Sequence, residues 1–166
     1  MAINAYACAL GLMAVVPASV QALVTALPRE LLSQRPTADG WSVEDIVAHL
    51  LQAETVGIRP RIQQMLVEDN PLLVAAPAST PVRGVETILE ELVAARTANL
   101  AFLHELTPEQ LTRTGRHQKY GIISVREHVI EWAYHDQDHL QQLVTIIQDA
   151  LYPEIGAFQA LYPRSR

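Results

Sequence analysis

Residues 124–150 constrain the fold more than any other part of the chain. Ser124 and Glu127 have the spacing of a capping box, which marks the first turn of a helix. The apolar side chains of the helix that follows occur on nearly every face and are Val129, Trp132, Ala133, Leu140, Leu143, Val144, Ile146 and Ile147. A helix that is apolar nearly all round must be covered on all sides. The segment is therefore predicted to be the central helix of a helical bundle.

The rest of the chain supplies three more helices. They are predicted at 18–33, from Ser42 onward, and at about 83–105, because apolar residues recur there three and four positions apart. The pattern at Thr107 adds one short helical turn. No stretch shows sustained alternation of apolar and polar residues, so no β-sheet is predicted.

Prolines and glycines indicate where these helices are interrupted. Pro28 should kink or interrupt the first helix, and Gly57 and Pro60 should bend the second. The segment 70–81 is predicted to be a long surface loop between the second and third helices, and 113–123 a solvated basic connection. Four helices with one long crossover predict an all-α fold, a four-helix bundle.

The composition limits the class of protein. The chain is expected to form one domain, 1–166, with its core at about 18–150. Its formal charge of −6 argues against nucleic acid as a partner. The apolar stretch 1–16 lacks the Lys or Arg of a signal peptide, and no other apolar run approaches the roughly 18 residues of a membrane span. The stretch 1–16 is therefore interpreted as part or precursor of the first helix. We expect a cytoplasmic protein with no membrane partner, in which the single cysteine, Cys8, is no nucleophile.

Three histidines are the candidate site. His135 and His139 lie one turn apart on the last helix, and His49 falls on the inward stripe of the helix that begins at Ser42. Two imidazoles at this spacing can share a metal ion, and a third from a facing helix would leave positions open for water. The alternatives are that the pair arises by chance and that an inward histidine is simply hydrogen-bonded in the core. Spacing alone does not show that the two helices face each other.

Three segments together resemble the DinB/YfiT-like superfamily of metal-binding four-helix bundles. They are WSVEDIVAHLLQAE (41–54), GRHQKYG (115–121) and SVREHVIEWAYHDQDHLQQL (124–143). The first and last carry the specificity: a tryptophan and a helix cap ahead of a helix with one histidine, then H-x-x-x-H followed by leucine. The resemblance covers the chain from about 18 to 150. It implies that His49, His135 and His139 are the metal ligands.

The resemblance also implies a function. Proteins of this superfamily hold a divalent ion, often nickel or zinc, and include thiol-dependent S-transferases and proteins called metal-dependent hydrolases. The chain is therefore expected to act on a small-molecule substrate, with the ion activating water or a low-molecular-weight thiol. The alternative is a non-catalytic, metal-binding stress-response protein that dimerises. The apolar tail after residue 150 could pack back on the bundle or form a homodimer contact.

Four further residues are candidates for the surroundings of the ion. His128 lies two turns before His135, about 10 Å along the helix axis, which is too far to share one ion. It would line a cavity or simply pack. Glu131 is placed to accept an imidazole N–H from His135. Trp132 lies on the same stripe, and Glu54 on the second helix is a weaker candidate.

Three charged residues near the stripe are expected to lie outside the chemistry. Asp136 occupies the position of the glutamate in H-E-x-x-H but is one methylene shorter and lies about 100° round the helix from the ligand face. Asp138 has the same geometry. Either could orient a ligand histidine, but a solvated face explains both. Arg96 on the third helix could bind a substrate carboxylate, although an exposed helix edge is the simpler interpretation.

Overall fold

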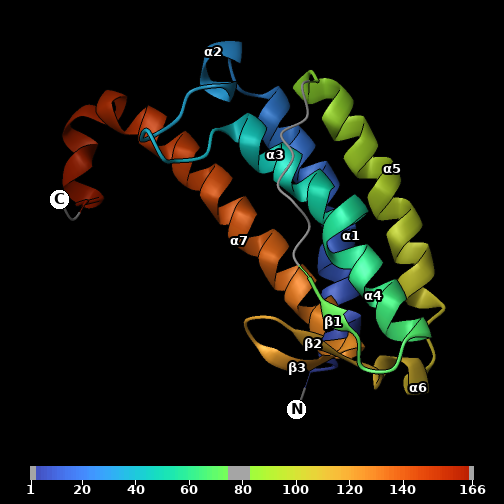
Figure 1. Cartoon of the computed structure of the whole chain (residues 1–166). Helices are drawn as coiled ribbons and strands as arrows, with labels where there is room; N and C mark the ends of the chain where they lie inside the picture. Colours follow the sequence, from blue (N-terminus) through green and yellow to red (C-terminus); the bar gives the residue numbers. More distant parts are fainter. Residues whose placement is uncertain (1–2, 75–82, 165–166) are drawn as a thin grey trace.

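The chain folds into a four-helix bundle with a small β-sheet at one end (Figure 1). The computed structural model describes residues 3–74 and 83–164. Its elements are α1 (Ala5–Thr25), α2 (Arg29–Leu32), α3 (Val43–Gln52), η1 (Ala53–Gly57), α4 (Ile58–Val67), β1 (Leu72–Leu73), α5 (Val85–His104), α6 (Pro108–Leu111), β2 (Thr114–His117), β3 (Gly121–Ser124), α7 (Val125–Leu151) and η2 (Tyr152–Leu161). The predicted all-α fold class is confirmed, and α5 and α7 confirm the third and last helices.

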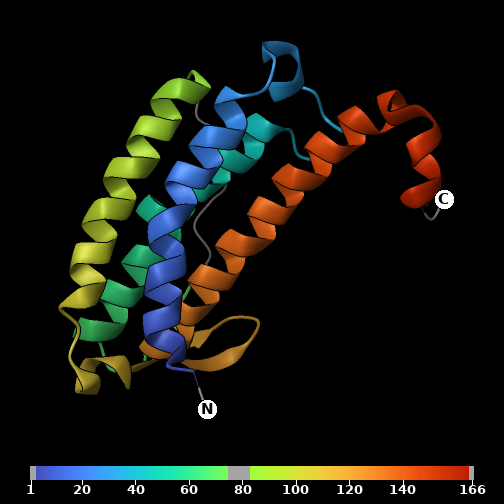
Figure 2. The same cartoon turned by 180° about the vertical axis from the view of Figure 1, so that it is seen from behind.

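Helices α3 and α7 are neighbours in the bundle. Helix α1 packs against α5 and α7, and α3 packs against the same two helices. Figure 2, the view from behind, shows α1 between α5 and α7. The second helix of the bundle continues from α3 through η1 into α4, which also packs on α7. The helix with the single histidine therefore lies beside the helix with the pair.

The apolar core consists of two clusters separated by polar residues. On α7 the last buried residue of one cluster is Ala133, and the first buried residue of the other is Leu143. On α5 the corresponding break lies between Leu92 and Leu103. The buried polar side chains within these breaks are Glu54, Arg96, Asn99, Asp136 and His139. A polar layer thus crosses the bundle at mid-length, and any site in it is flanked by apolar packing on both sides.

Capping boxes set the helix starts that position the histidines. The Ser42 hydroxyl accepts from the Asp45 amide at 3.2 Å, and the Asp45 carboxylate accepts from the Ser42 amide at 2.9 Å. Ser124 and Glu127 form the same reciprocal pair at α7, and Thr107 begins α6 in this way. These starts agree with the sequence pattern.

The first helix includes the apolar N-terminal stretch and ends earlier than predicted. It spans Ala5–Thr25, so the stretch before 18 is part of the helix and not its precursor. The predicted end at 33 is wrong, and the core begins at Ala9 instead of near 18. The stretch before 18 shows no helical period because almost all of its residues are apolar. Pro28 interrupts the chain as predicted, since it stands at the N-cap of the separate helix α2.

Helix α1 is also the longest apolar stretch of the chain. Among the residues that the structure describes, it is the one helix with the length and hydropathy to cross a membrane. A core helix passes the same test. Here α1 buries one stripe against α5 and α7, as a core helix of the bundle does.

The prediction that no sheet forms is wrong. Strands β2 and β3 pair antiparallel, and β1 runs parallel to β2. Strands of two to four residues are too short for alternation to show. Strand β1 falls inside the predicted loop 70–81, of which 75–81 lie outside the described residues. The hairpin replaces the predicted loop 113–123. Gly115 permits close packing here, since a Cβ would lie 2.9 Å from Leu73 Cδ1.

The expected bend in the second helix takes the form of a π-helical segment, η1. Pro60 follows it and cannot donate to the carbonyl of Val56. A π-helical turn holds an extra residue, so it changes the face that the following side chains present. Glu54 lies in this segment and is buried in the core. The segment also forms part of the cavity wall described below.

The C-terminal tail extends away from the bundle (Figure 1). In η2 no residue is buried, and Phe158 and Leu161 are exposed. The tail contacts α7 but does not fold back over the core. Its contact with a second subunit stays a prediction.

Candidate metal centre

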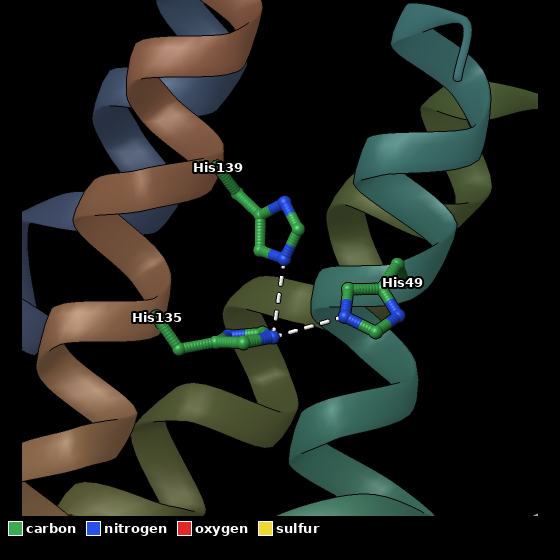
Figure 3. A group of neighbouring side chains, drawn as sticks. All are labelled: His49, His135 and His139. Carbon is green, nitrogen blue, oxygen red and sulfur yellow. Dashed lines mark hydrogen bonds between the residues drawn. The ribbon is translucent and has the colours of Figure 1, made fainter. Parts of the chain in front are cut away.

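Three imidazole nitrogens meet between α3 and α7 (Figure 3). His135 Nε2 lies 2.9 Å from His49 Nε2 and 3.1 Å from His139 Nε2. His49 comes from α3, and the other two histidines lie one turn apart on α7. The structure therefore brings together the three residues that the sequence singled out. It also shows that α3 and α7 face each other, which the spacing of the histidines could not show.

The contacts among these nitrogens cannot all be hydrogen bonds. An imidazole nitrogen carries either one proton or one lone pair in the ring plane, so it makes one hydrogen bond. His135 Nε2 has two nitrogen neighbours instead. Two nitrogens about 2.1 Å from one ion and at right angles about it would be about 3.0 Å apart. The observed separations agree with that spacing, so the donor set fits a divalent metal ion.

The protonation states also suit metal binding, which requires neutral imidazoles. His139 Nδ1 lies 3.0 Å from Gln142 Oε1, so Nδ1–H donates to the amide oxygen and Nε2 keeps its lone pair. Burial and the neighbouring imidazoles of His139 and His135 lower the pKa of His49 to about 4. Burial, and then His135, lowers the pKa of His139 as well. Both rings are therefore neutral at neutral pH.

We expect Gln142→Leu to weaken nickel or zinc binding about tenfold, because outer partners of ligating histidines contribute on this scale. The leucine no longer accepts from His139 Nδ1, so the ring is free to rotate and to change tautomer. The measurement is a competition titration against a chromophoric chelator. Gln141→Leu is the matched control, since Gln141 is the exposed neighbour on the same helix. Equal affinities in the two variants would remove Gln142 from the site.

Trp41 lies against two of the three histidines. Its indole lies nearly parallel to the His139 ring, at 8° and 5.5 Å between centroids. It also contacts the His49 ring at 4.7 Å. The sequence assigned Trp41 to the start of its helix and missed this contact. The signal that could have found it is a large apolar residue next to the Ser42 N-cap, which must fold against the first turns of the helix.

A buried ion-pair network lies next to the histidines. Arg96 of α5 pairs with Glu54 of η1 and with Asp136 of α7, where Nη1 is 2.7 Å from Oδ2. All three side chains are at most 2% exposed. Arg96 Nη1 also donates to the Met13 carbonyl oxygen of α1. The exposed edge predicted for Arg96 and the solvated face predicted for Asp136 are therefore wrong, because the bundle encloses α7 on that side too.

The network reaches the histidines through Asp136. Its Oδ1 lies 4.0 Å from His135 Nδ1, and both atoms are buried without a hydrogen-bond partner in the part of the chain that the structure describes. Glu54 is held by Arg96 and by Asn99. It was a candidate for the surroundings of the ion, yet none of its hydrogen bonds within the described residues involves a histidine. Asp138 is exposed, as expected.

A cavity of about 500 Å³ opens beside His49 and His135. Its polar lining away from these histidines comprises Arg61, His117, Tyr120, Glu127, His128 and Glu131. Of the two roles left open for His128, the structure favours lining a cavity. Arg61 was not foreseen, and no pattern in the sequence indicates its inward place on α4.

The last two candidates differ in their surroundings. Glu131 lines the cavity, and its carboxylate faces the His128 imidazole instead of His135, with 3.4 Å between Oε2 and Nδ1. Trp132 is fully buried in an apolar cluster, outside the cavity lining. Its indole lies under the Arg96 guanidinium, 5.5 Å from the ring centroid. Trp132 thus supports the polar layer and does not line the cavity.

Comparison with known families and structures agrees with this picture. A family model described as the DinB superfamily matches residues 13–143, which include all three histidines. Among solved structures, YfiT from Bacillus subtilis superposes with a TM-score of 0.79 at 18% identity and covers 90% of both chains. It is described as "a probable metal-dependent hydrolase with an unusual four-helix bundle topology". At this identity the likeness shows the fold.

Two curated proteins of Oceanobacillus iheyensis are similar in sequence. "Putative metal-dependent hydrolase OB0413" is 26% identical over 133 residues, and the match covers 72% of each chain. "Putative metal-dependent hydrolase OB0782" is 22% identical over 136 residues, and that match covers 78% of each chain. Both matches therefore span most of the bundle.

Proposed function

This chain belongs to the DinB superfamily, and from that premise we propose that it is a metal-dependent hydrolase acting on a small molecule. The observation that carries the proposal is the meeting of three imidazole nitrogens, 2.9 and 3.1 Å apart, at the wall of a cavity of about 500 Å³. His49, His135 and His139 would hold one divalent ion, nickel or zinc, through Nε2. The names of the two Oceanobacillus relatives and the description of YfiT support the hydrolase assignment.

The residues around the three nitrogens prepare the site for chemistry. A divalent ion held by three histidines acts as a Lewis acid and lowers the pKa of a bound water or thiol toward neutrality. The cavity is in the range of about 300–1,000 Å³ that is usual for small-molecule sites. Apolar side chains such as Ile58 and Ile123 form part of its wall and limit the access of water. Trp41 restricts approach from its side of the rings.

A second reaction suits the same donor set. The one cysteine, Cys8, is exposed on α1 and does not line the cavity. A thiol nucleophile would therefore come from a low-molecular-weight co-substrate, as in a thiol S-transferase. The ion would favour the thiolate as it favours hydroxide, so assays must separate the two reactions.

The test begins with elemental analysis of the protein purified without added metal. We expect about one divalent ion per chain and hydrolysis within a panel of small esters and amides. Chelation should abolish the hydrolysis, and reloading with nickel or zinc should restore it. Consumption of a small thiol with a generic electrophile is measured in parallel.

Each result decides between the candidates. Metal-dependent thiol consumption without hydrolysis would replace the hydrolase by an S-transferase. A tightly held ion with neither activity would favour the non-catalytic metal-binding protein. If excess nickel and zinc both fail to bind in stoichiometric amount, the metal proposal itself is lost.

A further inference from the structure

The cavity holds a second histidine site at some distance from the three ligand candidates. His128 lies on α7 two turns before His135, about 10 Å along the axis, and it lines the same cavity. The residue is only 4% exposed. Its Nδ1 lies 3.4 Å from the Glu131 carboxylate. Its Nε2 is buried and has no hydrogen-bond partner within 3–74 and 83–164.

An unpartnered buried imidazole nitrogen requires an explanation. Leaving such a group unsatisfied costs about 1–3 kcal/mol, so buried polar atoms usually have a partner. A histidine that serves packing alone would satisfy both nitrogens or be replaced by an apolar side chain. The partner of Nε2 is therefore expected to come from the contents of the cavity, which are water and substrate.

The carboxylate beside Nδ1 determines the role of the other nitrogen. Burial raises the pKa of Glu131, but the hydrogen bond and charge of His128, followed by His135 and Arg61, lower it below its ordinary value. Glu131 is therefore ionised and favours a proton on His128 Nδ1. Nε2 then carries the lone pair and can accept a proton.

The other titratable groups of the cavity do not compete for this role. Glu127 Oε2 accepts from the Ser124 amide at 2.7 Å in the helix cap. Arg61 on α4 donates from Nε to the Val74 carbonyl oxygen at 3.1 Å. His117 Nδ1 on β2 accepts from the Lys119 and Tyr120 amides at 3.1 and 3.3 Å, so the proton of its neutral ring is on Nε2. Tyr120, which follows that strand, is exposed.

At the other end of the cavity lie His49 and His135, whose Nε2 atoms point toward each other, where the proposed ion would be held. Glu131 is thus the carboxylate that faces His128, and His128 is the proton acceptor that the cavity leaves free.

We propose, on the basis of the hydrolase function above, that His128 transfers protons during hydrolysis and that Glu131 is its positioning residue. His128 Nε2 takes a proton from the attacking water through ordered water in the cavity, since the two ends of the cavity lie about 10 Å apart. The O–H bond breaks, its electron pair stays on oxygen, and an N–H bond forms at Nε2. The oxygen bonds to the carbonyl carbon of the ester or amide, whose bond to the leaving oxygen or nitrogen then breaks. Nδ1–H stays with Glu131, whose charge stabilises the imidazolium. The imidazolium then returns the proton to the leaving oxygen or nitrogen of the ester or amide, and Nε2 regains its lone pair.

The test compares His128→Gln with His104→Gln, whose histidine is exposed at the end of α5. His128→Gln should bind nickel or zinc within about twofold of wild type, because its side chain is not a ligand. Its kcat/KM at neutral pH should fall by about 100-fold or more, the usual scale of general acid–base catalysis. His104→Gln should match the wild type in both measurements.

Glu131→Gln tests the positioning role separately. It should keep the metal, lower kcat/KM less than His128→Gln does, and move the proton of neutral His128 from Nδ1 toward Nε2, since the charged acceptor beside Nδ1 is lost. A nitrogen-15 NMR spectrum of the wild-type imidazoles supplies a readout independent of activity. It should show the proton of neutral His128 on Nδ1.

Two results would overturn the inference. They are a neutral wild-type tautomer with the proton on Nε2, and a His128→Gln variant with wild-type kcat/KM. If the metal-loaded wild type shows no hydrolysis at all, the proposed function fails first, and the NMR result still decides the tautomer.

Discussion

His135→Ala should lower the affinity for nickel or zinc by at least about 100-fold, more than the 10- to 100-fold that loss of an outer partner costs. His135 Nε2 is the nitrogen that lies close to both others, at 2.9 Å from His49 and 3.1 Å from His139. Without it, one nitrogen remains on each of two helices. A pair of ligands on separate elements holds an ion far less tightly than three that converge.

The same variant should keep its fold. The His135 side chain is 22% exposed and lies outside both apolar clusters. Its Nδ1 is buried without a hydrogen-bond partner among the described residues, so alanine removes an unsatisfied group together with the ligand. We therefore expect the helical circular dichroism of the metal-free protein to be unchanged.

The measurement is metal content after dialysis, with affinity from chelator competition. His104→Ala is the control, because this histidine is exposed at the end of α5. The comparison shows whether loss of any imidazole reduces metal content. Unchanged occupancy in His135→Ala would end the case for the three-histidine site.

Helix capping and helical spacing predicted the features of this structure that depend on residues close together in sequence. The starts of α3, α6 and α7 follow from side chains that cap their own first turns, at Ser42, Thr107 and Ser124. The pair His135 and His139 follows from helical spacing in the same way. The placement of a third histidine opposite that pair depends on packing between helices, and the sequence indicated it through the family resemblance alone.

The wrong prediction for Asp136 shows the limit of inferring burial from helical spacing. Its rotation from the histidine face predicted contact with solvent, but a helix that is apolar nearly all round has few solvated faces. The central position predicted for the last helix was therefore the better guide to Asp136. The partner, Arg96, comes from α5, 40 residues away in sequence, and no local pattern connects the two. Strand β1 was missed for a similar reason, because its partner β2 lies more than 40 residues away in sequence. The hairpin of β2 and β3 is local in sequence, but its strands are too short for alternation to show.

The polar layer that contains Asp136 is a costly way to build a core. Two carboxylates and one guanidinium are withdrawn from water, and their mutual attraction compensates for that loss only while all three are present. Asn99 completes the layer by donating to the Glu54 carboxylate at 2.7 Å. The layer connects α1, η1, α5 and α7 at the level of the histidines. Arg96 is the member on which the others depend, since it contacts both carboxylates and a backbone carbonyl.

Arg96→Met should therefore destabilise the protein by about 3–5 kcal/mol, the usual cost of leaving buried charges unpaired. Total stabilities are about 5–15 kcal/mol, so this is a large fraction. Urea unfolding measures it, and Arg83→Met is the control. Arg83 forms an exposed pair with Glu91, for which a loss of about 0–1 kcal/mol is expected. An equal effect in the two variants would show that the network contributes no more than a surface pair.

The pH dependence of the Arg96→Met defect identifies its cause. Burial raises the pKa of Glu54 even beside Arg96, whose hydrogen bond and charge oppose the shift. Removing Arg96 should raise that pKa further. A carboxyl with a higher pKa in the folded chain binds more protons when folded, so the free energy of unfolding increases as pH falls. The difference between wild type and Arg96→Met should therefore shrink between about pH 7 and pH 5. A difference that stays constant over this range would instead indicate lost packing of the arginine stem against Trp132.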